Sequence, residues 1–161
     1  MNLVIDAGNT RTKIGIFEGA TLTVAKVFDQ LDEARTFLRR QTAEHLIVSA
    51  VTADGDSLGS LVRLHGQQMK LTPSLPLPIQ NRYETPQTLG PDRLAAACGA
   101  WQLFPRESSL VIDCGTCINY EFVHADGYYA GGGISPGISM RFRAMHEMTD
   151  RLPLGDPAEG A

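Results

Sequence analysis

The sequence predicts an α/β fold in which one strand-rich unit occurs twice. Short runs of β-branched and apolar residues alternate with glycine-containing turns and with segments of helical periodicity along the 161 residues. The run LVID begins at Leu3 and recurs at Leu110, and Gly8 matches Gly115 at the same offset of 107 residues. The order of strands, turns and a helix after each run is also the same, which indicates an internal duplication.

The first copy begins with three strands, predicted over residues 2–6, 12–17 and 21–28. A helix over 32–41, a buried strand over 45–51 and an amphipathic helix over 56–66 are expected to follow. Five prolines interrupt residues 72–91, which predicts a long ordered loop. Pro91 then starts a helix, in which the three- and four-residue spacing of Leu94, Cys98, Trp101 and Phe104 predicts one buried stripe.

The second copy restarts at Ser109 with three further strands, over residues 110–115, 118–127 and 128–135, and a helix over about 136–152. We therefore divide the chain into a first domain, 1–106, and a second domain, 107–161. The second copy stops after one helix, and the polar segment LPLGDPAEGA supplies no further element, so we expect this half to be incomplete.

Composition restricts the functional classes. With 43% hydrophobic residues the chain can bury a core. The net charge of −4 and the scattered arginines predict no binding to nucleic acid or to an anionic membrane surface. No apolar run approaches the roughly 20 residues needed to span a bilayer. The sequence thus predicts a soluble cytoplasmic protein.

The three cysteines, Cys98, Cys114 and Cys117, are an odd number and do not form a disulfide framework. A zinc site would need a second pair of ligands at similar spacing. A thioredoxin-type pair would open a helix, whereas a strand is predicted after Cys117. We expect small buried residues without a metal or redox role.

Two turns carry the residue types that suit phosphate chemistry. In the first, Asp6 is followed by Gly8, Asn9, Thr10, Thr12 and Lys13; in the second, Asp113 is followed by Gly115 and Thr116. Backbone N–H groups of a tight turn can bind phosphate oxygens, and a carboxylate can hold a cation directly or through water. The alternative is an ordinary hairpin turn, because Asp-x-Gly is a common turn composition. The repetition favours two phosphate turns that clamp one nucleotide.

The glycine-rich segment AGGGISPG has neither the Walker nor the dinucleotide-binding spacing. It is interpreted equally well as a bend where two backbone segments approach closely.

The segment LGPDRLAAA places Asp92 and Arg93 in the first turn of the helix that starts at Pro91. A carboxylate there is favoured by the helix dipole, so Asp92 can be a capping group. The other interpretation makes Asp92 a general base, acting by its position on a hydroxyl that attacks phosphorus, with Arg93 binding a carboxylate or phosphate.

Four segments in this order, DAGNTRTK, TPQTLGPDRLAAA, DCGTCINYEF and GGGISPGISMRFRAM, resemble the type III pantothenate kinase family of the acetate kinase, sugar kinase and actin superfamily. The resemblance covers nearly the whole chain. It implies a duplicated actin-like ATPase fold, related to ribonuclease H, with a mixed five-stranded sheet and flanking helices in the first half. It also implies ATP-dependent phosphorylation of the 4′-hydroxyl of pantothenate, the first step towards coenzyme A.

The resemblance further implies roles for individual residues. The first phosphate turn would hold ATP, with Asp6 near a magnesium ion through water and Lys13 near the transferred phosphate. Asp92 would be the base. The remaining implied ligands are Gly115 and Thr116 for ATP phosphate, Asp113 for a monovalent cation (potassium or ammonium), and Tyr83, Gly90, Pro91 and Arg93 for pantothenate.

The family also departs from this chain in two respects. Many relatives have Asp-x-Gly-Thr-Ala-x-Thr-x-Asp in the second turn, where this chain has Cys117, Asn119 and Glu121 at the last three named positions. Family members are longer, and they are homodimers in which the partner subunit completes the pantothenate site. Two alternatives stay open: a non-enzymatic nucleotide-binding regulator, and another small-molecule kinase of the superfamily.

Overall fold

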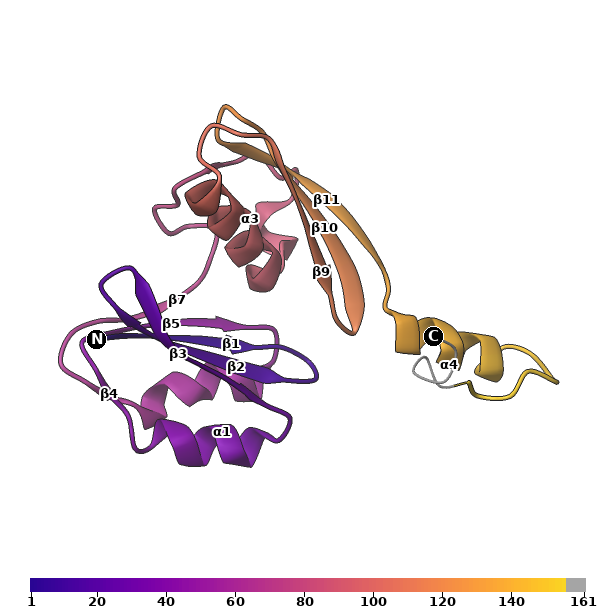
Figure 1. The fold of residues 1–161 in the computed structure, drawn as a ribbon, viewed down its shortest axis with the longest axis horizontal. Helices are drawn as coiled ribbons and strands as arrows, with labels where there is room; N and C mark the ends of the chain where they lie inside the picture. The colour runs from indigo at the N-terminus through magenta and orange to yellow at the C-terminus, as the bar shows by residue number, and fades with distance from the viewer. Residues whose placement is uncertain (156–161) are drawn as a thin grey trace. The chain divides into compact units, whose positions relative to one another are not determined.

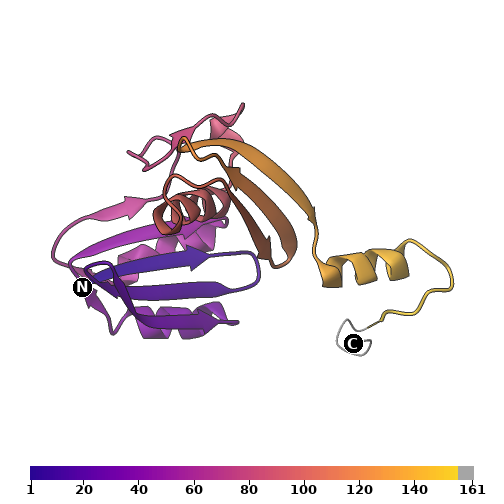
Figure 2. The same ribbon diagram turned by 45° about the horizontal axis from the view of Figure 1, so that its top comes forward.

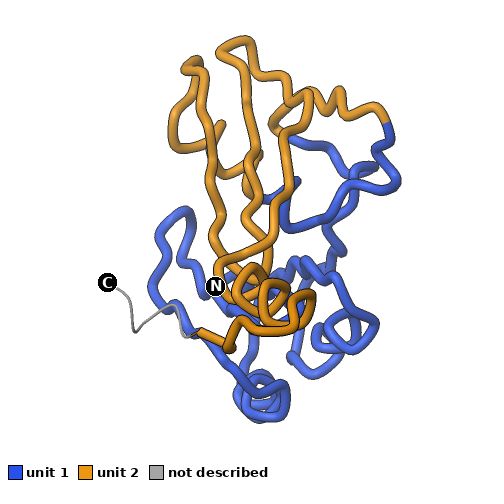
Figure 3. Tube along the Cα trace, turned by 90° about the vertical axis from the view of Figure 1, so that its right-hand side faces the viewer, with its two compact units in different colours: residues 1–77, 85–95 blue, residues 78–84, 96–161 orange. Residues whose placement is uncertain are grey.

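The computed structural model describes residues 1–155 and divides the chain into two compact units (Figure 3). The first comprises Met1–Leu77 and Thr85–Ala95; the second comprises Pro78–Glu84 and the chain from Ala96 onward. The segment predicted as a polar end, residues 152–161, lies partly outside the described residues. The division of the chain at residue 106 stays a prediction.

The first unit contains the mixed five-stranded sheet that the family resemblance implied (Figure 1). Its strand order is β3-β2-β1-β5-β7; β1 and β2, and β2 and β3, are antiparallel, whereas β5 runs parallel to β1 and β7 parallel to β5. The strands are β1 (Asn2–Ala7), β2 (Thr12–Glu18), β3 (Thr21–Phe28), β5 (His45–Ala50) and β7 (Gln68–Lys70). The predicted strands 2–6, 12–17, 21–28 and 45–51 are confirmed to within one residue, and β7 was not predicted.

The core of this unit lies on one face of its sheet. Alternate residues of β1, namely Leu3 and Ile5, are buried, as the period of two in a strand requires. Helix α1 (Leu31–Leu38) packs Ala34 and Leu38 into the same cluster. Figure 2 shows the helix and the sheet from a second side. Removing a leucine of this kind from water stabilises the fold by about 1.5–3 kcal/mol.

The prediction of an amphipathic helix over residues 56–66 is wrong. The chain instead forms a four-residue α-helix, α2 (Ala53–Asp56), a 3-10 helix, η1 (Ser57–Leu61), and β6 (Arg63–Leu64), which pairs in parallel with β4 (Thr42–Ala43). Two glycines explain the difference. A Cβ on Gly55 would lie 2.6 Å from the Cβ of Ala7, and a Cβ on Gly59 would lie 2.4 Å from the amide of Gln68. Tertiary close approach therefore overrides the helical periodicity.

The loop predicted over residues 72–91 is confirmed in most of its length. It carries only two short elements, β8 (Gln80–Asn81), which pairs in parallel with β11 (Tyr128–Pro136), and the 3-10 helix η2 (Pro86–Thr88). Helix α3 (Pro91–Leu103) begins at the predicted proline. Its predicted stripe is correct at Leu94, which is buried, but wrong at Phe104, which is 53% exposed because the helix ends one residue earlier.

The second unit contains a four-stranded sheet of order β8-β11-β10-β9, followed by helix α4 (Ile138–Glu147). The predicted second meander is present as β9 (Ser109–Cys114), β10 (Cys117–Val123) and β11 (Tyr128–Pro136). Both β9 and β11 pair antiparallel with β10. The predicted helix 136–152 is shorter than expected. None of the helices among residues 1–155 is long and apolar enough to cross a membrane.

The two LVID strands differ in burial. Leu3 and Ile5 are 1% and 0% exposed, whereas Leu110 and Ile112, at the matching positions of β9, are 60% and 54% exposed. The same local sequence therefore forms the same strand, while what covers the strand is determined by more distant parts of the chain.

Candidate functional site

The first phosphate turn joins β1 to β2 and brings a carboxylate and an ammonium group together. Asp6 and Lys13 are cross-strand neighbours, and the Lys13 Nζ lies 3.7 Å from the Asp6 Oδ2. The Gly8 N–H donates to the carbonyl oxygen of Arg11 at 3.0 Å, which closes the turn. Asn9 and Thr10 form its exposed tip. Five residues predicted from the sequence thus lie at one turn in the first unit, and Lys13 faces a carboxylate.

Ser49 also contacts this turn, although the sequence analysis did not select it. It lies on β5 in register with Asp6, and its hydroxyl donates to the Asp6 Oδ1 at 3.3 Å. Ser49 is only 5% exposed. A single hydroxyl within the apolar run HLIVSA was the signal that could have identified it, because a buried polar side chain requires a partner.

The start of α3 arranges Asp92 against Gly90. A Cβ on Gly90 would lie 2.5 Å from the Asp92 Oδ1, so the carboxylate occupies the space that a side chain at position 90 would take. The Leu94 N–H donates to the Gly90 carbonyl oxygen at 3.1 Å, which begins the helical hydrogen bonding. Asp92 is half-buried, whereas Arg93 is buried. Position 90 is therefore occupied by glycine for a steric reason, because a residue without a side chain leaves room for the Asp92 carboxylate.

The second turn has a similar construction in the second unit. Asp113 pairs with Asn119, as Asp6 pairs with Lys13, and the Gly115 N–H donates to the Cys117 carbonyl oxygen at 2.9 Å. Asp113 and Thr116 are both exposed. The amide in place of the lysine gives this turn no cation across the hairpin, so the two turns are not chemically equivalent.

The glycine-rich segment approaches this second turn closely. A Cβ on Gly137 would lie 2.3 Å from the Gly115 carbonyl oxygen, and the Gly137 N–H donates to the Thr116 carbonyl oxygen at 3.0 Å. A Cβ on Gly132 would lie 1.6 Å from the Tyr120 carbonyl oxygen. The predicted bend in AGGGISPG is wrong, because residues 130–136 of the segment lie in strand β11, but the predicted close approach of two backbone segments is confirmed.

Tyr83, which is half-buried, packs on a buried aromatic and acidic pair within the second unit. Its ring stacks on that of Tyr129, with centroids 6.3 Å apart and an interplanar angle of 8°. The Tyr129 hydroxyl donates to the Glu121 Oε2, and both of these residues are at most 1% exposed. Gly131 has φ +115°, and a Cβ added to it would lie 3.0 Å from the Tyr83 ring, so the backbone comes close to the ring only because this residue is glycine. Tyr83 thus packs against β11, through the Tyr129 ring and Gly131.

The cysteines are all free thiols. Cys98 is half-buried, and burial raises the pKa of its thiol. Cys114 is exposed, so its predicted burial is wrong; it lies near the end of β9, whose neighbouring residues are also uncovered. Within residues 1–155, no group of three or more His, Cys, Asp or Glu side chains is arranged to hold a metal ion.

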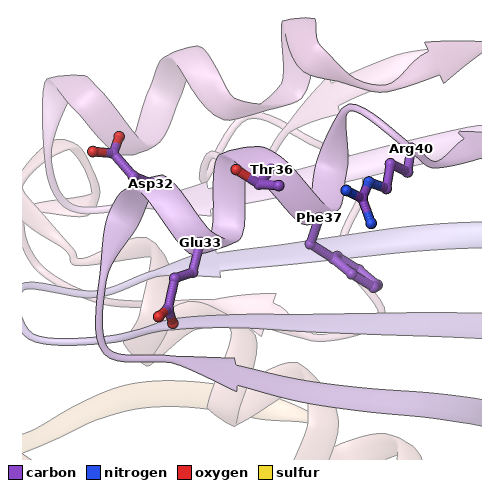
Figure 4. A pocket seen from close by; sticks show the side chains of 5 residues that line it. All are labelled: Asp32, Glu33, Thr36, Phe37 and Arg40. Carbon is purple, nitrogen blue, oxygen red and sulfur yellow. The ribbon is translucent and has the colours of Figure 1, made fainter.

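A shallow hollow lies on helix α1, away from the predicted site residues. It measures about 420 Å³ and is lined by Asp32, Glu33, Thr36, Phe37 and Arg40 (Figure 4). All five lining side chains come from one stretch of α1 and its end, and none of them was selected from the sequence. The hollow therefore adds nothing to the phosphate turns.

The comparisons with known proteins agree with the motifs. A family model described as type III pantothenate kinase matches residues 2–160. Curated relatives of that name include those of Bacteroides fragilis, 44% identical over 158 residues, Phocaeicola vulgatus, 42%, and Cytophaga hutchinsonii, 40%. The matches cover 95–96% of this chain but 64–65% of each relative. The chain thus spans about two thirds of the length of these relatives.

A solved structure supports the fold. A chain from Campylobacter jejuni, described as a conserved Baf family transcriptional activator, superposes with a TM-score of 0.57 at 21% identity. The superposition covers 91% of this chain and 60% of that one. With the family model matching almost every residue, the chain belongs to the type III pantothenate kinase family.

Proposed function

We propose that this chain carries the machinery for ATP-dependent phosphorylation of the 4′-hydroxyl of pantothenate, which forms 4′-phosphopantothenate at the start of coenzyme A synthesis. The observation that carries the proposal is the Asp6–Lys13 pair, at 3.7 Å, in the turn to which the family resemblance assigns the ATP phosphates. Phosphoryl transfer needs positioning and charge neutralisation rather than covalent chemistry. A lysine and a carboxylate in a phosphate turn match that need.

The first turn would bind ATP through its exposed tip and through Lys13. The Gly8 amide closes the turn on Arg11, so the phosphate oxygens would meet the side chains of Asn9 and Thr10 and the ammonium group of Lys13. Lys13 is 54% exposed and can exchange the carboxylate for a phosphate. The ammonium group would then neutralise the charge that develops on the transferred phosphoryl group.

Asp6 is the residue that would hold magnesium. Its carboxylate is 34% exposed and oxygen-rich, which suits a hard cation. Magnesium typically takes one or two protein carboxylates, keeps several waters and takes its other ligands from substrate phosphates. The residues present therefore fit the ion, which would supply charge neutralisation at the phosphates. In the second unit, Asp113 would hold the monovalent cation, potassium or ammonium, and Gly115 and Thr116 would meet ATP phosphate.

Asp92 would act as the general base on the pantothenate hydroxyl. Its carboxylate lies over Gly90 at the start of α3, where it is only half-buried and can meet a ligand. A base in this position accepts the proton as the hydroxyl oxygen attacks phosphorus. Gly90, Pro91 and Arg93 of the first unit would bind pantothenate. Tyr83, which lies in the second unit, is the fourth pantothenate ligand that the family resemblance implies, and its stacking on Tyr129 would fix the orientation of its ring.

The finer points of architecture belong to this proposal as well. The two meanders share strand order and begin with the same four residues, which supports a duplicated actin-like fold divided near residue 106. The family resemblance suggests a cytoplasmic homodimer whose partner subunit completes the pantothenate site.

The test is mass spectrometry of 4′-phosphopantothenate after incubation with ATP, magnesium, potassium and pantothenate. We expect Asp92→Asn to lose at least about a hundredfold in rate, the lower end of the general-base range, while ATP still binds. Asp32→Asn is the matched control, because Asp32 also lies in the first turn of a helix, and it should keep full activity. No product from the parent chain, or an undiminished rate in Asp92→Asn, would refute the proposal.

A further inference from the structure

Three neighbouring strands carry a lysine, an aspartate and a serine at one level of the first sheet. Asp6 on β1 is in register with Lys13 on β2 and with Ser49 on β5. The three side chains therefore form one row across the sheet, with the carboxylate in the middle. Asp6 and Lys13 lie on the two strands that flank the phosphate turn, whereas Ser49 lies on a third strand outside it.

The two neighbours contact different oxygens of the Asp6 carboxylate. The Ser49 hydroxyl donates to Oδ1 at 3.3 Å, and the Lys13 Nζ lies 3.7 Å from Oδ2. The terminal torsion of an aspartate has a broad energy profile, so hydrogen bonds decide the orientation of the carboxylate plane. Ser49 is buried, which keeps this hydrogen bond from competing with bulk water.

The exposure of the two neighbours gives the carboxylate a buried side and an accessible side. Ser49 is 5% exposed, whereas the Lys13 side chain is 54% exposed. Oδ1 is therefore held from within the sheet, and Oδ2 faces the more exposed partner. A carboxylate held in this way offers one defined oxygen to a ligand at the turn.

We propose that Ser49 is a positioning residue of the phosphate turn: it orients the Asp6 carboxylate for magnesium-bound nucleotide. This inference rests on the proposed function and extends it to a residue outside the turn. Ser49 itself contacts neither nucleotide nor metal. Its effect is confined to the metal-dependent part of ATP binding, because Lys13 and the turn tip meet the phosphates directly.

The experiment measures ATP dissociation constants of the full chain by isothermal titration calorimetry, with magnesium and with EDTA. The dissociation constant in EDTA divided by that in magnesium is a ratio that isolates the contribution of the metal. Loss of a hydrogen bond to a charged group corresponds to roughly a tenfold to 150-fold change in an equilibrium constant. We expect Ser49→Ala to reduce the ratio by about that factor, and Ser49→Thr, which keeps the hydroxyl, to retain most of it.

Val48→Ala is the control for a merely structural effect. Val48 is the adjacent residue of β5, is 2% exposed and belongs to the hydrophobic core, so its truncation destabilises the same strand without touching Asp6. This variant should lower the melting temperature and leave the ratio unchanged. An unchanged ratio in Ser49→Ala, or an equal loss in Val48→Ala, overturns the inference. A parent chain that binds no ATP overturns the proposed function instead, so the two failures are distinguishable.

Discussion

Truncating the same leucine in each LVID strand should have unequal effects on stability. Leu3 and Leu110 stand at matching positions of β1 and β9, and they are 1% and 60% exposed. Leu3 packs in the core cluster together with Leu38 and Leu46. Leu3→Ala therefore removes buried methyl groups and leaves a cavity, whereas Leu110→Ala mainly removes surface that already contacts water.

The magnitudes follow from these exposures. A fully buried leucine costs about 2–5 kcal/mol when it is replaced by alanine, because lost transfer free energy and a cavity add together. Complete burial of a leucine side chain contributes about 1.5–3 kcal/mol, so four-tenths of it contributes about 1 kcal/mol. We therefore expect Leu3→Ala to destabilise its unit by at least about twice as much as Leu110→Ala destabilises the other.

Hydrogen exchange followed by mass spectrometry measures the two units separately, because peptides from β1 and β9 are resolved from each other. The opening free energy of the β1 amides should fall strongly in Leu3→Ala, and that of the β9 amides only slightly in Leu110→Ala. Ile5→Val and Ile112→Val repeat the comparison with a smaller change. A loss in Leu110→Ala equal to or larger than that in Leu3→Ala would refute the reasoning from burial.

Three further predictions follow from local contacts. Gly90→Ala should lower the phosphorylation rate at least tenfold with little change in melting temperature, because the new methyl group displaces the Asp92 carboxylate from its present position; a rate equal to that of the parent would contradict this steric role. Gly127→Ala should cost about 1–3 kcal/mol of unfolding free energy in urea titration, since position 127 has φ +79° and the indole ring of Trp101 would lie 3.1 Å from the added Cβ; an unchanged midpoint of unfolding would contradict this strain. Cys114 should be alkylated by iodoacetamide before Cys98, because burial raises the pKa of the Cys98 thiol and disfavours its thiolate; equal alkylation rates of the two cysteines would be inconsistent with the structure. The same raised pKa makes the contribution of the Cys98 thiol to folding stability greatest at low pH, and this contribution is lost as the pH rises past the ordinary pKa of a thiol towards the raised one.

Several elements could be predicted because their signals are local. The meander strands follow from β-branched residues between turns, and α3 starts at a proline, whose fixed φ and missing N–H suit the first helical position. The prediction failed over residues 56–66, where helical periodicity was present. The glycines at 55 and 59 are packed against residues distant in sequence, and this contact could not be seen in the pattern.

The candidate site shows the same limit. Its chemistry-bearing residues, Asp6, Lys13 and Asp92, could be selected from the sequence because each lies in a motif with a turn or a helix start. Ser49 could not, since only the parallel pairing of β1 with β5 brings its hydroxyl to Asp6. The role of Gly90 also became visible only when the Asp92 carboxylate was seen above it.

The sequence by itself determined the family, the positions of the two turns that contain Asp6 and Asp113, and the identity of most strands. The tertiary structure alone decided which oxygen of Asp6 each neighbour contacts, and why Leu3 is buried while Leu110 is exposed. The physical reason is that backbone conformation depends mainly on neighbouring residues, so LVID forms a strand twice. Burial and side-chain pairing depend instead on segments far along the chain, which differ between the two units.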